Sequence, residues 1–108
     1  MAAPDIEFFQ GDFGDNYDIS LYNADGTVAD ITGYTAGTLT IKTYDRITTK
    51  LSAKAISIVI ANPALVRWAM ASGDTDYNDE NLLAQIELTG TSKVKKTFFL
   101  KCSAYAVL

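Results

Sequence analysis

The segment from 74 to 80 is where the side chains best suited to chemistry lie closest together. It carries four carboxylates, those of Asp74, Asp76, Asp79 and Glu80. A pair of carboxylates can supply the acid and the base of glycoside hydrolysis. That chemistry needs an apolar pocket to raise the pKa of one carboxyl, and this polar segment predicts no such pocket. We therefore do not expect a hydrolase site here.

The same segment has oxygen ligands at alternate positions, as the first half of an EF-hand calcium loop does. An EF-hand is nonetheless excluded, because Asp79 stands where that loop needs glycine and Gln85 where it needs glutamate. The plainer interpretation of residues 74–80 is a solvated acidic turn. A looser calcium site is the open alternative.

The chain contains no histidine, which removes the commonest general base and the usual imidazole metal ligand. Cys102 is the only cysteine, so no internal disulfide can form. On a strand Cys102 would share its face with Phe98 and Leu100, and we expect a small buried hydrophobe rather than a nucleophile. The sequence thus predicts a protein that is not an enzyme, with no catalytic residue, no defined metal-ligand set and no cofactor.

Size and composition indicate one globular domain over residues 1–108. Hydrophobic residues make up 48% of the chain and charged residues 20%, which is too apolar for a disordered chain and enough for one core. The formal charge of −4 would repel a phosphate backbone, so we expect no nucleic-acid partner. No run approaches the roughly 18 apolar residues of a membrane span, and the first residues lack the basic and apolar regions of a signal peptide. We expect no membrane partner.

Most of the chain shows the period-two alternation of β-strands, as where Leu39 and Ile41 alternate with polar neighbours. The expected extended runs are 6–9, 17–21, 27–31, 38–42, 56–60, 82–88 and 97–103. The last two of these runs should form a hairpin. The polar segment 45–54 fits either a long loop or a short edge strand. About seven strands at this spacing predict an all-β fold, a single antiparallel β-sandwich.

One segment, from 62 to 70, is expected to be helical. Asn62 followed by Pro63 supplies the cap and first-turn residues of a helix entry, and apolar residues follow at positions 65, 68 and 69. We predict a short crossover helix that lays Trp68 over one end of the sandwich. An indole that lines a binding pocket is the alternative.

Large apolar side chains are also expected outside the core, on outward strand positions and near both ends of the sequence. The predicted partner interface consists of Phe8, Phe9, Phe13, Phe99, Tyr105, Val107 and Leu108. Because apolar groups of this size gather on surfaces that bind other proteins, we expect them to pack against a neighbouring subunit. The alternative, that they complete the core of the domain itself, stays open.

Several motifs occur together in this chain. They are Gly11-Asp12, Tyr17 to Leu21, the run from Asp25 to Gly33, Leu39 to Ile41, and Leu83 to Leu88 before the final hairpin. In this order they resemble the N-terminal domain of phage baseplate upper proteins. The hallmark of that family is a strand, a turn-rich connection ending in glycine, an extended strand, a short helix and a strand pair near the end.

This resemblance implies an immunoglobulin-like β-sandwich that docks an appendage onto a phage tail or baseplate in several copies. The implied partners are other virion proteins and copies of the chain itself, and the implied location is the virion, assembled in the host cytoplasm. The chain stops after its last predicted strand, without the fibre or receptor-binding region that normally follows, so host recognition is not implied. Alternatives are a capsid or head decoration protein, and a small carbohydrate-binding module that stacks sugars on Tyr22, Tyr44 or Trp68.

Overall fold

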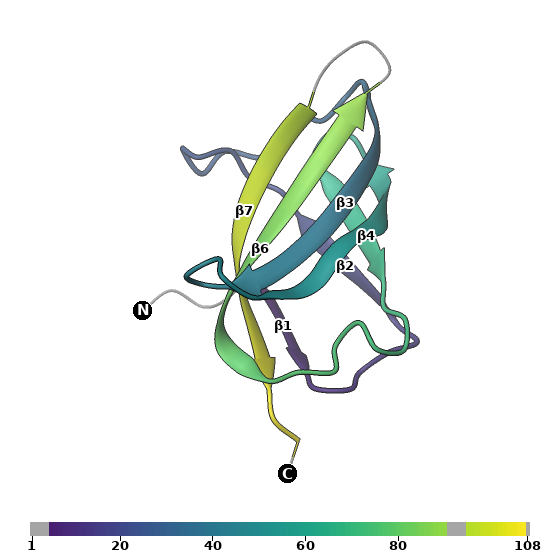
Figure 1. Cartoon of the computed structure of the whole chain (residues 1–108). Helices are drawn as coiled ribbons and strands as arrows, with labels where there is room; N and C mark the ends of the chain where they lie inside the picture. Colours follow the sequence, from purple (N-terminus) through teal and green to yellow (C-terminus); the bar gives the residue numbers. More distant parts are fainter. Residues whose placement is uncertain (1–4, 91–94, 108) are drawn as a thin grey trace.

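The structure describes residues 5–90 and 95–107. In this part of the chain seven β-strands form one sheet. In this computed structural model the strands are β1 (Ile6–Phe9), β2 (Asn16–Ser20), β3 (Tyr34–Thr43), β4 (Thr49–Ile60), β5 (Leu65–Ala69), β6 (Asp79–Gly90) and β7 (Lys95–Tyr105). Their order across the sheet is β1-β7-β6-β3-β4-β5-β2. Figure 1 shows β7, β6, β3 and β4 side by side. The expected all-β class is confirmed, although not every strand lies where the sequence predicts it.

Three long antiparallel strands, β3, β6 and β7, form the centre of the sheet, and their inward residues follow the expected alternation. The fully buried residues of β6 are Leu82, Ala84, Ile86 and Leu88. The register places Ile86 opposite Leu39 of β3 on one side and opposite Phe98 of β7 on the other. The predicted hairpin of β6 and β7 is therefore confirmed, while the residues that join the two strands, 91–94, lie outside the described part of the chain.

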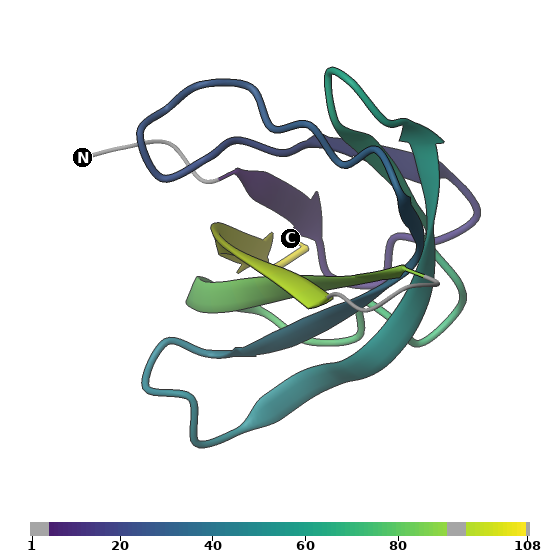
Figure 2. The same ribbon diagram turned by 90° about the horizontal axis from the view of Figure 1, so that it is seen from above.

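β4 makes the sheet turn back on itself. Its first part pairs with β3, and its last residues pair with β5 instead. The β3 ladder is interrupted near Ala53, which has a φ of 45° and donates its N–H to Thr40 Oγ1 at 3.0 Å, and such bulges increase strand twist. The sheet curls until it is nearly closed into a barrel (Figure 2). The segment 45–54 is thus a turn followed by the first half of β4.

The crossover helix predicted for residues 62–70 is wrong, because Leu65–Ala69 is strand β5. Positions 64, 66, 68 and 70 are buried and alternate with more exposed neighbours, which is the period of a strand. β5 pairs with β2 on one side and β4 on the other, and these two ladders outweigh a local capping signal. Trp68 is accordingly a fully buried core residue and does not lie over one end of the fold.

Among the described residues, no helix is long and apolar enough to cross a membrane.

The segment expected as a strand at 27–31 is irregular. A single bridge joins Tyr22 to Val28, and no longer ladder is formed by this stretch of the described chain. Ala29 and Ile31 are nevertheless fully buried, so the segment still contributes to the core.

β1 lies at the edge of the sheet beside the last half of β7. The two strands run parallel, with Ile6 opposite Cys102 and Phe9 opposite Tyr105. Toward β2, on the far side of the curl, the N–H of Glu7 donates to the hydroxyl oxygen of Tyr17 at 2.9 Å. The core fills the space inside. Cys102 is fully buried there, as predicted, and burial raises the pKa of its thiol to about 12.

Candidate functional site

β1 and β7 both finish at the lower end of the curled sheet in Figure 1. The residues at and around these ends line a groove. We call it the end groove; its volume is about 540 Å³. The residues that line it are Glu7, Phe8, Phe9, Asp12, Phe13, Asp15, Asn16, Tyr17, Met70 and Tyr105. They come from β1, β2, the end of β7, the segment that joins β1 to β2 and the residue after β5.

Aromatic side chains form much of the end groove. Phe9 and Tyr105 are opposite each other in the parallel ladder of β1 and β7, and their ring centroids are 5.8 Å apart. Phe9 is 55% exposed, and Phe13, on the connection after β1, is 61% exposed. The pairing of β1 with β7 thus brings Phe9 and Tyr105 together, although they are nearly a hundred positions apart in the sequence.

The prediction that Phe8 lies on the outer surface is wrong. It is only 5% exposed and packs edge-on against Trp68, with ring centroids 5.6 Å apart. Neighbouring residues of a strand point to opposite faces, so Phe8 and Phe9 cannot both face outward. Phe8 lines the end groove from its core side.

Four of the seven predicted interface residues therefore meet at the end groove: Phe8, Phe9, Phe13 and Tyr105. Phe99 does not, because it lies on the outer face of β7, where the Arg46 guanidinium stands 5.3 Å from the centre of its ring. Val107 is 65% exposed and is not among the lining residues. Leu108 lies outside the described residues.

Three carboxylates, those of Glu7, Asp12 and Asp15, also line the end groove, and none of them was predicted as a site residue from the sequence. The Glu7 carboxylate accepts a hydrogen bond from Tyr105 Oη at 3.1 Å. Burial, followed by this bond to an anion, raises the pKa of Tyr105. The Asp12 carboxylate accepts the N–H of Phe9 at 3.2 Å. The sequence marks Gly11 to Asp15 only as a turn, so it gives no signal that these carboxylates share one groove.

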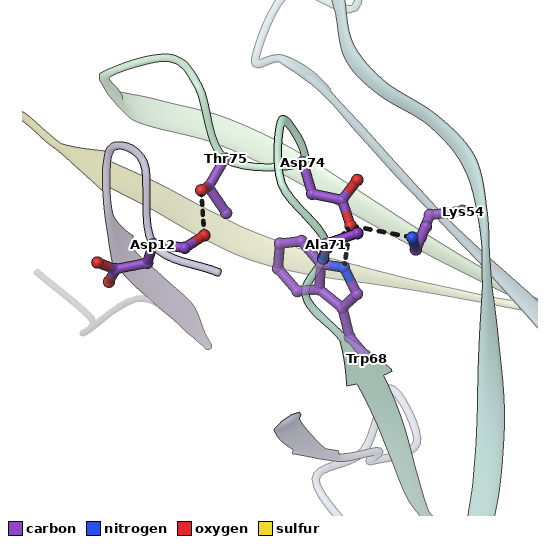
Figure 3. A network of polar contacts seen from close by, with 6 residues as sticks. All are labelled: Asp12, Lys54, Trp68, Ala71, Asp74 and Thr75. Carbon is purple, nitrogen blue, oxygen red and sulfur yellow. Dashed lines mark hydrogen bonds and ion pairs between the residues drawn. The ribbon is translucent and has the colours of Figure 1, made fainter. Parts of the chain in front are cut away.

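The connection between β1 and β2 is held in place by its backbone. Gly11 and Gly14 have φ values of 89° and 93°, a conformation that residues with a side chain rarely adopt. The N–H of Gly14 donates to the carbonyl of Met70 at 2.8 Å, and that of Gly11 donates to the carbonyl of Thr75 at 2.9 Å. The hydroxyl of Thr75, which is 1% exposed, donates to the carbonyl of Asp12 (Figure 3). Phe13 is thus presented from a fixed loop.

Asp74 anchors the segment that carries Thr75. Its Oδ2 accepts Trp68 Nε1 at 3.2 Å and the N–H of Ala71 at 3.0 Å, and it lies 3.2 Å from Lys54 Nζ (Figure 3). Burial acts to raise the pKa of Asp74, but the hydrogen bonds from Ala71 and Trp68 and the charge of Lys54 outweigh it, and the pKa is lowered. Asp74 is therefore an ionised structural anchor.

The looser calcium site and the sugar-stacking platform were alternatives that the sequence left open. In residues 5–90 and 95–107 no three aspartate, glutamate or cysteine side chains are placed to hold a metal ion. Asp79 uses its carboxylate to accept the N–H of Asn81 at 2.8 Å, within its own turn. Trp68 is buried and so offers no stacking platform for sugars, while Tyr22 and Tyr44 are exposed but line different hollows.

No family model matches the chain, and neither a curated protein nor a solved structure matches it. The resemblance to phage baseplate upper proteins therefore stays a prediction.

Proposed function

We propose that this chain is a structural module of a phage virion, a tail or baseplate adaptor that docks onto neighbouring virion proteins through the end groove. The observation that carries the docking site is the exposure of Phe9 and Phe13, at 55% and 61%, beside a groove of about 540 Å³. Large aromatic side chains supply most of the binding energy where proteins meet. The virion as the place of docking comes from the motif resemblance.

The rigidity of the groove supports this role. Phe9 and Tyr105 belong to paired strands, and Phe13 stands on the connection that Thr75 ties down. Binding therefore orders few groups that were free before, and less of the interaction free energy is lost to conformational entropy. The two-sheet, immunoglobulin-like arrangement is part of the same proposal, and the curl at β4, where one strand passes from one set of partners to another, is compatible with it.

The test is incorporation of tagged chains into virions purified from the host culture that produces the protein. The double variant Phe9→Ser with Phe13→Ser should fold normally, because both side chains are exposed, and should be lost from particles. Ile47→Ser is the matched control, since Ile47 is 81% exposed on the turn before β4 and should have no effect. Absence of the unaltered chain from particles, or normal incorporation of the double variant, would contradict the proposal.

A further inference from the structure

We infer that the end groove binds a basic side chain of the partner protein, arginine in preference to lysine. This inference rests on the docking role proposed above and names the chemistry of the docking partner. It is carried by the coincidence of aromatic walls and carboxylates in one groove that has no basic residue in its lining.

The aromatic walls suit an organic cation. Phe9, Phe13 and Tyr105 come from three segments around one hollow, and the rings of Phe9 and Tyr105 are inclined at 50° to each other. A cation over the face of such a ring is attracted by the negative electrostatic potential that the ring quadrupole creates there. A guanidinium group also stacks flat against aromatic rings, which an ammonium group does not do as well.

The carboxylates supply the matching charge. Asp15 is exposed; its backbone carbonyl accepts the N–H of Met70 at 3.1 Å, and among the described residues its carboxylate has no hydrogen-bond or ion-pair partner. Glu7 and Asp12 each accept one hydrogen bond and keep acceptor capacity on their remaining lone pairs. A guanidinium presents five donors in a planar fork and can bridge such acceptors.

A metal ion is a poorer occupant than a basic side chain. A hard cation such as calcium needs several oxygen ligands converging on one point. The described residues hold no group of three potential ligands placed in that way, so the carboxylates of the groove are too dispersed. Aromatic walls add nothing to the binding of a hydrated metal ion but favour an organic one.

A second copy of the chain is also a poorer occupant. Each copy carries a net charge of −4, so two copies repel each other at long range. Four of the nine basic residues, both arginines among them, are already engaged within the chain, in the contacts Lys54–Asp74, Arg67–Asp18, Lys95–Glu87 and Arg46–Phe99. A basic segment of a different protein meets neither obstacle.

The test uses three short peptides that differ at one position, which holds arginine, lysine or citrulline. Citrulline has the shape of arginine without its charge. Titrated into isotopically labelled protein, the arginine peptide should shift the amide resonances of Phe9, Phe13 and Gly14. It should bind about tenfold more tightly than the citrulline peptide, with lysine between them, and high salt should weaken it.

Matched variants locate the binding. Asp12→Asn with Asp15→Asn should weaken the arginine peptide about tenfold, because each amide keeps an acceptor oxygen but loses the charge. Asp25→Asn with Asp45→Asn removes the same amount of charge from exposed turn residues that do not line the groove, and should change affinity little. Phe13→Leu keeps the apolar surface but removes the π-system, and should also weaken binding.

Equal binding of the arginine and citrulline peptides, equal effects of the two charge variants, or displacement of the peptide by calcium would each overturn the inference. Self-association of the unaltered chain would also overturn it, if the double variant Phe9→Ser with Phe13→Ser no longer self-associates. If those aromatic changes prevent incorporation into virions while Asp12→Asn with Asp15→Asn does not, the docking role stands and the inference fails. If the peptides behave as expected but the chain is absent from virions, the inference stands and the proposed function fails.

Discussion

Replacing Asp74 by alanine tests how the end groove is held in place. The Asp74 carboxylate joins three parts of the fold, because it bonds to Trp68 on β5, to the backbone of Ala71 and to Lys54 on β4. The next residue, Thr75, holds the loop that bears Phe13. Loss of the carboxylate should therefore lower global stability and loosen the groove.

The loss of stability expected for Asp74→Ala can be estimated from the groups that lose their partner. Trp68 is fully buried, so its orphaned indole N–H costs about 1–3 kcal/mol. The ion pair with Lys54 is partly exposed, at 29% and 12% for the two side chains, and contributes at most about 1 kcal/mol. Ala71 is an exposed residue, so we expect its backbone N–H to bond to water instead. We expect a loss of about 2–3 kcal/mol, from a typical total of about 5–15 kcal/mol.

Urea unfolding followed by tryptophan fluorescence is the assay, since Trp68 is the only tryptophan and reports its own environment. Asp74→Asn keeps an acceptor oxygen for the indole and should lose about half as much stability. Asp76→Ala, an exposed position in the same segment, is the control and should lie within about 0.5 kcal/mol of the unaltered protein. If Asp74→Ala behaves like this control, the anchoring role is refuted.

Three further outcomes are expected. The pKa of Asp74 is lower in the fold than its ordinary value of 3.8, so the stability that its carboxylate contributes is complete above that value and is lost as the pH falls through the folded pKa. In urea titrations below about pH 4, the free energy of unfolding should therefore decline less in Asp74→Asn than in the unaltered protein. Cys102, whose pKa burial raises to about 12, should resist iodoacetamide in the native protein and react in denaturant, and rapid native labelling would contradict its placement. Gly90→Ala would put a methyl group 2.6 Å from the carbonyl oxygen of Gly33, so thermal unfolding should show a loss of about 1–3 kcal/mol, and an unchanged midpoint would contradict that packing.

The strands that the sequence predicts well are those whose burial depends on local alternation alone. In β6 and β7 every second residue is apolar, and those residues face the core as expected, with Ile86 opposite Phe98. A period-two pattern contains enough information for this, because any single strand packed on one face must bury alternate residues.

The failure at β5 shows the limit of local patterns. Trp68 fits helical spacing with positions 65 and 69, and it fits strand spacing equally well with positions 64, 66 and 70. What decides between the two is pairing with β2, where Arg67 is opposite Asp18 and binds it through two hydrogen bonds of 2.7 and 3.0 Å. That partner is 49 residues away, so no short window of sequence contains it.

The end groove was beyond sequence reasoning for the same reason, although most of its aromatic members were identified. The parallel pairing of β1 with β7 puts Phe9 beside Tyr105, and nothing in either segment specifies the other. Alternation within β1 would have shown that Phe8 faces the core once Phe9 faces outward, and the error there was to treat both as surface residues.

The role of the Asp12 and Asp15 carboxylates also depends on how the fold brings distant segments together. In the sequence Asp12 and Asp15 resemble ordinary solvated turn residues, because neither has an apolar neighbour that repeats with a regular period. In the fold they line the same hollow as Phe9 and Tyr105, while Thr75 holds the loop that carries them. A carboxylate beside exposed aromatic rings on a fixed loop has a different use from one on a free turn, because a basic group that enters meets charge and ring faces already in position. The anchoring of Thr75 by its neighbour Asp74 is therefore part of the binding chemistry, although neither residue lines the groove.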